Sequence, residues 1–271
     1  MSSDPLPPED DGAWPAERPA AARTAGLAGS SPAEPWPRRP RRLATAVVDE
    51  LVDRLVRGEI PAGATLPTEP LLCQTFGVSR TVVREAVKSL ESMRLVRVQQ
   101  GQGTTVRHLG DWDLFNPTVL SAVIRHDAEL AILEDLVDVR SALEAQMAGQ
   151  AAQRADQRQR ELLTERMALL EQEVGDPARY LRADVDFHDA VMQASGNRLG
   201  RAMIHTLQME AYRSLRYVGD PTAAEMRLSN VAHRAVHDAV LAGDAEAAQD
   251  AMREHIIGSW HRRRPASDAP R

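Results

Sequence analysis

Residues 78–90 read VSRTVVREAVKSL, a segment with the two faces of an amphipathic helix. One face is apolar at the i, i+3, i+4, i+7 spacing typical of burial, and consists of Val83, Ala86, Val87 and Leu90. The opposite face carries three cations one turn apart, which are Arg80, Arg84 and Lys88. Ser79 precedes the periodic run, where its hydroxyl can cap the first free N–H groups. The segment is therefore predicted to be a capped helix with one buried and one cationic face.

A second, shorter helix is predicted directly before this one. It begins after Thr68, with Glu69 and Pro70 in its first turn, where proline costs little. Gly77 then supplies a tight turn into the basic helix. Helix, turn and capped basic helix form the helix-turn-helix arrangement, in which the second helix enters the DNA major groove. The alternative is a solvated surface helix, because charge runs usually face solvent.

The segments on either side favour DNA binding. Residues 43–57 have apolar positions along one helix face. After the basic helix, residues 95–99 alternate as a strand, residues 100–103 read QGQG and form a turn, and residues 104–107 return. Three helices followed by a two-stranded wing predict a winged helix-turn-helix domain over residues 38–108.

Charge is distributed unevenly along the chain, whose net charge is -6. Residues 38–108 hold 12 Lys and Arg against 7 Asp and Glu, whereas residues 109–271 hold 19 against 26. The basic excess therefore coincides with the predicted DNA-binding domain, as neutralisation of phosphates requires. Residues 38–42 read RRPRR and form a basic arm that either contacts phosphates or stays solvated.

The chain of 271 residues is long enough for two domains. Cys73 is the single cysteine, so no disulfide framework is expected and a reducing compartment is indicated. No run approaches the roughly 18 apolar residues of a membrane span, and the start of the chain lacks the order of a signal peptide. We therefore expect a cytoplasmic protein, with a disordered Pro- and Ala-rich tail over residues 1–37.

The remainder of the chain is predicted to be an antiparallel all-α bundle of six to seven helices. Apolar spacing predicts helices near 117–126, 128–154, 157–174, 177–194, 198–217, 222–242 and 244–260. The expected fold is thus mostly α, with a linker over residues 109–127, a helical domain over residues 128–260 and a disordered tail over residues 261–271. Trp112 and Phe115 in the linker are expected to be buried and to dock one domain on the other.

Four residues of the acidic half have the spacing of metal ligands. Asp184 and His188 stand at i and i+4, so both side chains leave one helix face. His233 and His255 each lie 11 residues from Asp244, which begins the turn of a predicted hairpin. Equal counts mean equal height, about 16 Å from the turn. One aspartate and three histidines are suitable ligands for a divalent transition metal of the Zn, Ni or Mn class.

Two alternatives remain open for these histidines. A histidine in an apolar helix is more often a satisfied core or surface residue than a ligand. His233 and His237 also form an i, i+4 pair like that of zinc hydrolases, but Arg234 stands where such enzymes place the general base.

Several ordered motifs resemble the GntR family of bacterial transcription regulators. They are LPTE at 66–69, GVSRT at 77–81, VREA at 83–86, LV at 95–96 and GQGT at 101–104. The resemblance implies a winged helix-turn-helix that binds a palindromic operator in double-stranded DNA as a homodimer. The recognition helix is expected to contact DNA through Ser79, Arg80, Thr81 and Arg84, and the resemblance adds Gln100 and Gly101 at the wing tip. One departure is Pro70, where the family usually has a DNA-contacting arginine.

A second resemblance covers about 130 to 258. Residues 136–144, 184–197, 232–236 and 252–255 look like the FCD ligand-binding domain, which defines the FadR subfamily. The resemblance implies that Asp184, His188, His233 and His255 hold a metal whose coordination a small carboxylate effector completes. It also implies that Arg140 faces the effector, with Asn197 close to it and Arg213 as a weaker candidate. An ion pair with Glu144 on the same helix is the alternative for Arg140.

The predicted function is a DNA-binding transcription regulator, a repressor and not an enzyme, controlled by a small carboxylate or sugar-acid effector. The connector at 111–117 resembles that of sugar-acid regulators in the subfamily. Alternatives are a regulator with a purely structural metal, and a metal-dependent hydrolase with a DNA-binding head, for which no general base is apparent. An acyl-CoA-responsive regulator without metal is disfavoured, because its pocket would not require three histidines and an aspartate.

Overall fold

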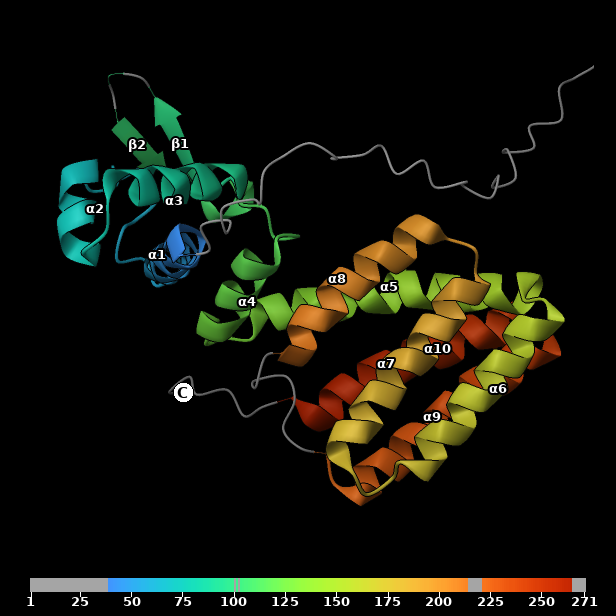
Figure 1. The fold of residues 1–271 in the computed structure, drawn as a ribbon. Helices are drawn as coiled ribbons and strands as arrows, with labels where there is room; N and C mark the ends of the chain where they lie inside the picture. The colour runs from blue at the N-terminus through green and yellow to red at the C-terminus, as the bar shows by residue number, and fades with distance from the viewer. Residues whose placement is uncertain (1–38, 100, 102, 214–220, 265–271) are drawn as a thin grey trace, which may run out of the picture. The chain divides into compact units, whose positions relative to one another are not determined.

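The computed structural model describes residues 39–99, 101, 103–213 and 221–264, which are mostly helical with one two-stranded sheet (Figure 1). The N-terminal elements are α1 (Arg39–Val56), α2 (Glu69–Phe76), α3 (Arg80–Ser92), β1 (Val96–Gln99) and β2 (Gly103–Val106). A short 3-10 turn (Leu109–Asp111) and α4 (Pro117–His126) follow. The remaining helices are α5 (Ala131–Arg154), α6 (Gln157–Gln172), α7 (Pro177–Ala194), α8 (Arg198–Arg213), α9 (Ala223–Ala242) and α10 (Ala245–Arg263). The predicted tail over residues 1–37 lies outside the described residues.

The first three helices pack around an apolar core, as the periodicity predicts. Its fully buried members include Leu51, Val52, Val83, Ala86, Leu90 and Leu95. The hydroxyl of Ser79 accepts a hydrogen bond from the Val82 N–H at 3.4 Å, so the predicted cap of α3 is confirmed. Thr68 occupies the capping position of α2, but its side chain makes no capping hydrogen bond. Gly77 ends α2 with φ of 63°, a left-handed conformation that glycine adopts without strain.

The predicted wing is confirmed as an antiparallel hairpin of β1 and β2. Its register pairs Val96 with Val106 and Gln99 with Gly103. Gly101 lies at the tip with φ of 78°, which suits a residue without Cβ. A bridge between Thr65 and Thr105 attaches the loop before α2 to the second strand.

The helices α5 to α10 form the predicted bundle, in which α10 lies against both α5 and α9 (Figure 1). Short polar side chains accept hydrogen bonds from free N–H groups at the helix starts, which is why the chain breaks where it does. These caps are Asp156, Asp176, Thr222 and Asp244. None of the described helices combines the length and apolar composition needed to cross a bilayer.

Several predicted boundaries differ from the structure. The helix α1 already begins at Arg39, so most of the predicted basic arm is helical; Pro40 fits there because the first turn needs no proline N–H. The helix α5 begins at Ala131, because Leu130 adopts a left-handed conformation with φ of 63°. The helix α10 continues to Arg263, into the segment predicted to be a tail.

The connector is only partly buried. Trp112 packs against the N-terminal core, and its indole N–H donates to the Arg107 carbonyl at 3.0 Å. Phe115, in contrast, is 51% exposed, so the prediction that it is buried is wrong. Hydrogen-bonded turns at Asp113 and Asn116 fix the backbone on either side of Phe115 and leave its ring in solvent.

The helix α4 contributes to two apolar cores. Val119, Ala122 and Val123 belong to the core of α1 to α3, whereas Leu120 and Ile124 belong to the core of the bundle. The carboxylate of Asp53 on α1 also accepts from Arg125 at 3.1 Å and lies 3.2 Å from His126. The apolar faces of α4 therefore connect the N-terminal winged-helix fold to the bundle.

We predict that Ile124→Ala lowers the free energy of unfolding by about 2–4 kcal/mol, because Ile124 is fully buried and its loss leaves a cavity. Chemical denaturation followed by circular dichroism measures this change. Ser121→Ala on the same helix is the control and should change stability far less, since Ser121 is only partly buried. Equal effects of the two substitutions would contradict the role assigned to α4.

Candidate metal centre and DNA-binding surface

Four potential metal ligands meet inside the bundle. Asp184 and His188 extend from α7, His233 from α9 and His255 from α10. All four are buried, and their ligand atoms lie within 4.8 Å of one another. The hairpin of α9 and α10 brings the rings of His233 and His255 to a centroid distance of 4.0 Å, as their equal distance from Asp244 predicts. The structure therefore brings together the four residues expected from their spacing.

The distances between these atoms fit a coordinated cation. The Nε2 atom of His188 lies 3.1 Å from Nε2 of His255 and 3.4 Å from Nε2 of His233. Oδ1 of Asp184 lies 3.2 Å from Nε2 of His233. A zinc-like ion bonded at about 2.0–2.1 Å separates neighbouring ligand atoms by about 3.0–3.4 Å. These three pairs therefore have spacings that one bound ion can span, and all four ligand atoms lie within 4.8 Å of one another.

The charge states of the cluster also suit a cation. Burial lowers the pKa of His233 and lowers that of His255 well below its usual value, so both rings are neutral at neutral pH. Burial acts to raise the pKa of Asp184, but its contacts with the surrounding imidazoles, led by the hydrogen bond with His233, hold that pKa well below its usual value. Neutral imidazoles and an ionised carboxylate are the protonation states that metal ligation requires.

A buried carboxylate on α5, which is not one of the four potential ligands, contacts the cluster through His188. Oε2 of Glu144 lies 2.6 Å from Nδ1 of His188, and Oε1 accepts a hydrogen bond from Nε of Arg140 at 2.6 Å. Burial acts to raise the pKa of Glu144, but Arg140 and His188 lower it to about 2. The ion pair considered for Arg140 is thus present. The contact of Glu144 with His188 was missed, because 44 residues separate the two and no local spacing signals it.

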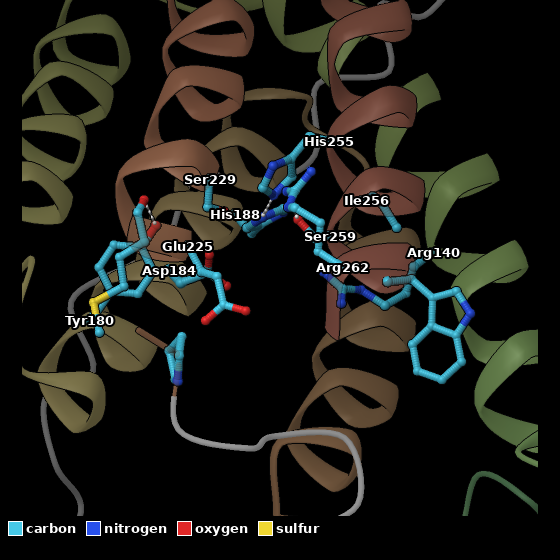
Figure 2. Close-up of a pocket in the computed structure, with 13 residues that line it drawn as sticks. Arg140, Tyr180, Asp184, His188, Glu225, Ser229, His255, Ile256, Ser259 and Arg262 are labelled. Atoms are coloured by element: carbon cyan, nitrogen blue, oxygen red, sulfur yellow. Dashed lines mark hydrogen bonds between the residues drawn. The ribbon is translucent and has the colours of Figure 1, made fainter. Parts of the chain in front are cut away.

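A small cavity of about 40 Å³ adjoins the cluster. Figure 2 shows Asp184 on one side of it and Arg140 and Arg262 on the other, with His188 and His255 between them. Glu225, Ser229 and Ser259 also line the cavity. Arg140 therefore borders the cavity while it pairs with Glu144.

His237 takes part in a different network, although it is also buried. Its Nε2 atom lies 3.1 Å from Oγ1 of Thr164, and its Nδ1 atom lies 2.7 Å from Asp238. The neighbouring Arg234 pairs with Glu171 on α6. The His233 and His237 pair considered for a zinc hydrolase therefore does not form a shared ligand set.

The candidate DNA-binding residues are exposed at the start of α3. They are Ser79, Arg80, Thr81 and Arg84. The guanidinium of Arg84 donates to both carboxylate oxygens of Glu69 at 3.0 and 3.1 Å, and Lys88 pairs with Glu85 at 3.0 Å. Gly101 is exposed at the wing tip, whereas Gln100 lies outside the described residues.

Comparison with known proteins identifies both parts of the chain. Residues 43–106 match the family described as bacterial regulatory proteins, gntR family, and residues 135–258 match the FCD domain. The putative L-lactate dehydrogenase operon regulatory protein of Escherichia coli (strain K12) is 33% identical over 228 residues, which cover 80% of this chain and 84% of that protein. The chain belongs to the gntR family of bacterial regulatory proteins.

Other gntR-family proteins align over similar lengths. The galactonate operon transcriptional repressor of Escherichia coli (strain K12) is 29% identical over 222 residues, covering 80% of this chain and 94% of that protein. The solved structure of Lar, which controls the expression of the Listeria monocytogenes agr system, has a TM-score of 0.50 at 16% identity and covers 81% of this chain and 97% of its own; it supports the fold alone. The chain is accordingly a DNA-binding transcription regulator with an FCD effector-binding domain, and not an enzyme.

Of the residues expected to bind the effector, Arg140 lines the cavity and Asn197 borders a different surface. The side-chain oxygen of Asn197 accepts from the Gly200 N–H at 2.9 Å in the first turn of α8. Asn197 borders a separate surface groove with Arg198, Arg201 and His205. Arg213 ends α8, and its side chain lies outside the described residues. Arg140 therefore remains the described candidate that lines the cavity beside the ligand cluster.

We predict that joint replacement of His233→Ala and His255→Ala abolishes binding of divalent transition metal, because it removes two of four converging ligands. Metal content after purification and the thermal shift on adding Zn²⁺ measure this. An ion present at about 100 times its dissociation constant stabilises a folded protein by about 2.7 kcal/mol.

His237→Ala is the matched control for this experiment, since it also removes a buried α9 imidazole but leaves the cluster intact. The control should keep the metal content and the shift of the wild type. Retention of metal by the double variant would remove the candidate centre.

Proposed function

We propose that this protein is a homodimeric repressor whose affinity for a palindromic operator is controlled by a small carboxylate effector bound at a metal site in the FCD domain. The observation that carries the proposal is the buried group of one carboxylate and three imidazoles beside a cavity lined by two arginines. The assignment as a repressor rather than an activator is supported by the name of the related galactonate operon transcriptional repressor.

The DNA-binding half of the proposal rests on the exposed start of α3. Arg80 and Arg84 project from its first turns, and an arginine can donate to O6 and N7 of guanine together. Glu69 accepts from Arg84 through both carboxylate oxygens and can hold its guanidinium in one orientation. We assign phosphate contacts to the wing tip at Gln100 and Gly101, since glycine lets the backbone approach closely. Pro70 removes one cation expected in this family, so the operator should differ from those read with that arginine.

The effector-binding half rests on charge and size. A bound divalent ion would supply a positive centre to which carboxylate oxygens can bind. Arg140 and Arg262 add guanidinium groups at the cavity, and Ser229, Ser259 and Glu225 can hydrogen-bond hydroxyl groups. A hydroxycarboxylate or sugar acid combines these features, and two relatives are named for galactonate and L-lactate dehydrogenase operons.

The cavity volume limits this proposal. A volume of about 40 Å³ has room for only a few water molecules at about 10–15 Å³ each, so a larger acid requires side chains to move. Arg262 is exposed and can move without unpacking the core. The small volume also favours a second candidate, in which the metal is purely structural and DNA binding does not depend on an effector.

Signal transfer is assigned to α4, because its residues lie in both apolar cores. A change in bundle packing on effector binding would shift α4 and the DNA-binding fold attached to it. Allosteric coupling of this kind amounts to about 1–3 kcal/mol in operator affinity.

We predict that a small hydroxycarboxylate weakens operator binding about 5- to 150-fold when Zn²⁺ is present, and not after chelation. A gel shift on a duplex from the protein's own promoter, titrated with L-lactate, D-galactonate and other organic acids, measures this. The His237→Ala protein should respond like the wild type, and the His233→Ala, His255→Ala protein should not respond. If no acid alters the shift while metal remains bound, the structural-metal candidate is favoured.

We predict that Arg80→Ala weakens operator binding by about 1–3 kcal/mol more than it weakens binding to random DNA. The reason is that a base contact contributes only on the correct sequence, whereas a phosphate contact contributes on every sequence. Fluorescence anisotropy with both duplexes at one salt concentration measures the difference. Arg166→Ala on α6 is the control and should change neither affinity. Equal losses on both duplexes would reduce Arg80 to a phosphate contact.

A further inference from the structure

Glu144 makes two short contacts at once in the interior of the bundle. One carboxylate oxygen accepts from Nε of Arg140, and the other lies 2.6 Å from Nδ1 of His188. Glu144 is fully buried, and His188 is 1% exposed. Because an ionised carboxylate has no proton to donate, the hydrogen bond to His188 requires a proton on Nδ1.

This contact fixes which ring nitrogen of His188 is available to a metal. In a neutral ring with its proton on Nδ1, the Nε2 atom carries a lone pair, and this atom lies 3.1 Å from Nε2 of His255 within the ligand cluster. A carboxylate behind a ligating histidine also sets the ring orientation and increases its strength as a ligand.

The other two histidines have no such support among the described residues. The Nδ1 atoms of His233 and His255 are buried and have no hydrogen-bond partner there. Among the described residues, His188 is therefore the ligand histidine whose Nδ1 atom contacts a carboxylate. An ordinary buried ion pair between Arg140 and Glu144 would not require the second oxygen to face His188.

We propose that Glu144 is a positioning residue that holds His188 as an Nε2 ligand, and that Arg140 keeps Glu144 in the orientation this requires. The metal-affinity part rests on the proposed function, whereas the tautomer part concerns the metal-free protein. The proposal extends the site beyond the four ligands to a chain of contacts from Arg140 through Glu144 to His188.

Glu144→Gln tests this chain with almost no change in volume. The amide oxygen must remain toward Arg140, because an amide N–H facing the guanidinium would oppose two donors. The amide N–H₂ then faces His188 and donates to Nδ1, so the ring proton moves to Nε2. That proton occupies the atom that should bind metal.

The first measurement is the tautomer of His188 in full-length, metal-free protein, by NMR of isotope-labelled histidine nitrogens. The expected results are the Nδ1–H tautomer in the wild type and the Nε2–H tautomer in Glu144→Gln. Glu144→Asp retains a carboxylate and should recover the Nδ1–H tautomer. An Nε2–H tautomer in the wild type overturns the proposal, even if the glutamine variant does not fold.

The second measurement is Zn²⁺ affinity by competition with a colorimetric chelator. Glu144→Gln should bind Zn²⁺ about 10- to 100-fold more weakly than the wild type. The matched control is Glu134→Gln. Glu134 lies on α5, as Glu144 does, and its substitution removes only a surface ion pair with Arg264. Equal Zn²⁺ affinities of the two variants would overturn the positioning role of Glu144 and leave the proposed metal site standing. A wild type that binds no Zn²⁺ would instead refute the proposed metal site, and the tautomer would still decide the positioning role.

Discussion

The burial of one carboxylate and three imidazoles in an apolar bundle is the constraint on which the rest of the domain depends. A charged group removed from water is costly unless a partner compensates it, so Asp184 needs the imidazole that lies 3.2 Å away. The groups come from α7, α9 and α10, and each helix must therefore keep its rotation and height within the bundle. Fully buried Phe187 packs edge-on against His233 with centroids 4.9 Å apart and limits how far that ring can turn.

The DNA-binding fold has exposed cations on α3, in contrast to the buried charged groups at the centre of the bundle. Its cations stay in solvent, where pairing is weak and reversible, so the partners of Arg84 and Lys88 can be exchanged for phosphates or bases at little cost. Of the three cations on the exposed face of α3, Arg80 has no ion pair with the described part of the chain. The helix is held by its apolar underside, which leaves the polar face available for recognition.

The amino-acid sequence predicted most of this architecture, because the signals were local. The helical spacing of apolar residues and the capping serine predicted α3, and alternating apolar residues predicted the wing. The equal number of residues from Asp244 to His233 and to His255 predicted that these two side chains lie together. The failures involved contacts between distant segments or details of turns. The partner of His188 lies 44 residues away on α5, and the exposure of Phe115 depends on two adjacent turns. The resemblance could not indicate that Asn197 accepts a hydrogen bond in the first turn of α8, which also depends on local turn geometry.

The shared position of α4 also determines where this protein can be divided. A fragment that stopped before Pro117 would deprive the N-terminal core of Val119, Ala122 and Val123 and leave an apolar gap at the surface. A fragment that began after His126 would deprive the bundle of Leu120 and Ile124. Neither half keeps its apolar core complete without α4. A hybrid regulator made from two relatives should therefore have its junction outside α4, so that the whole helix comes from one of the two proteins.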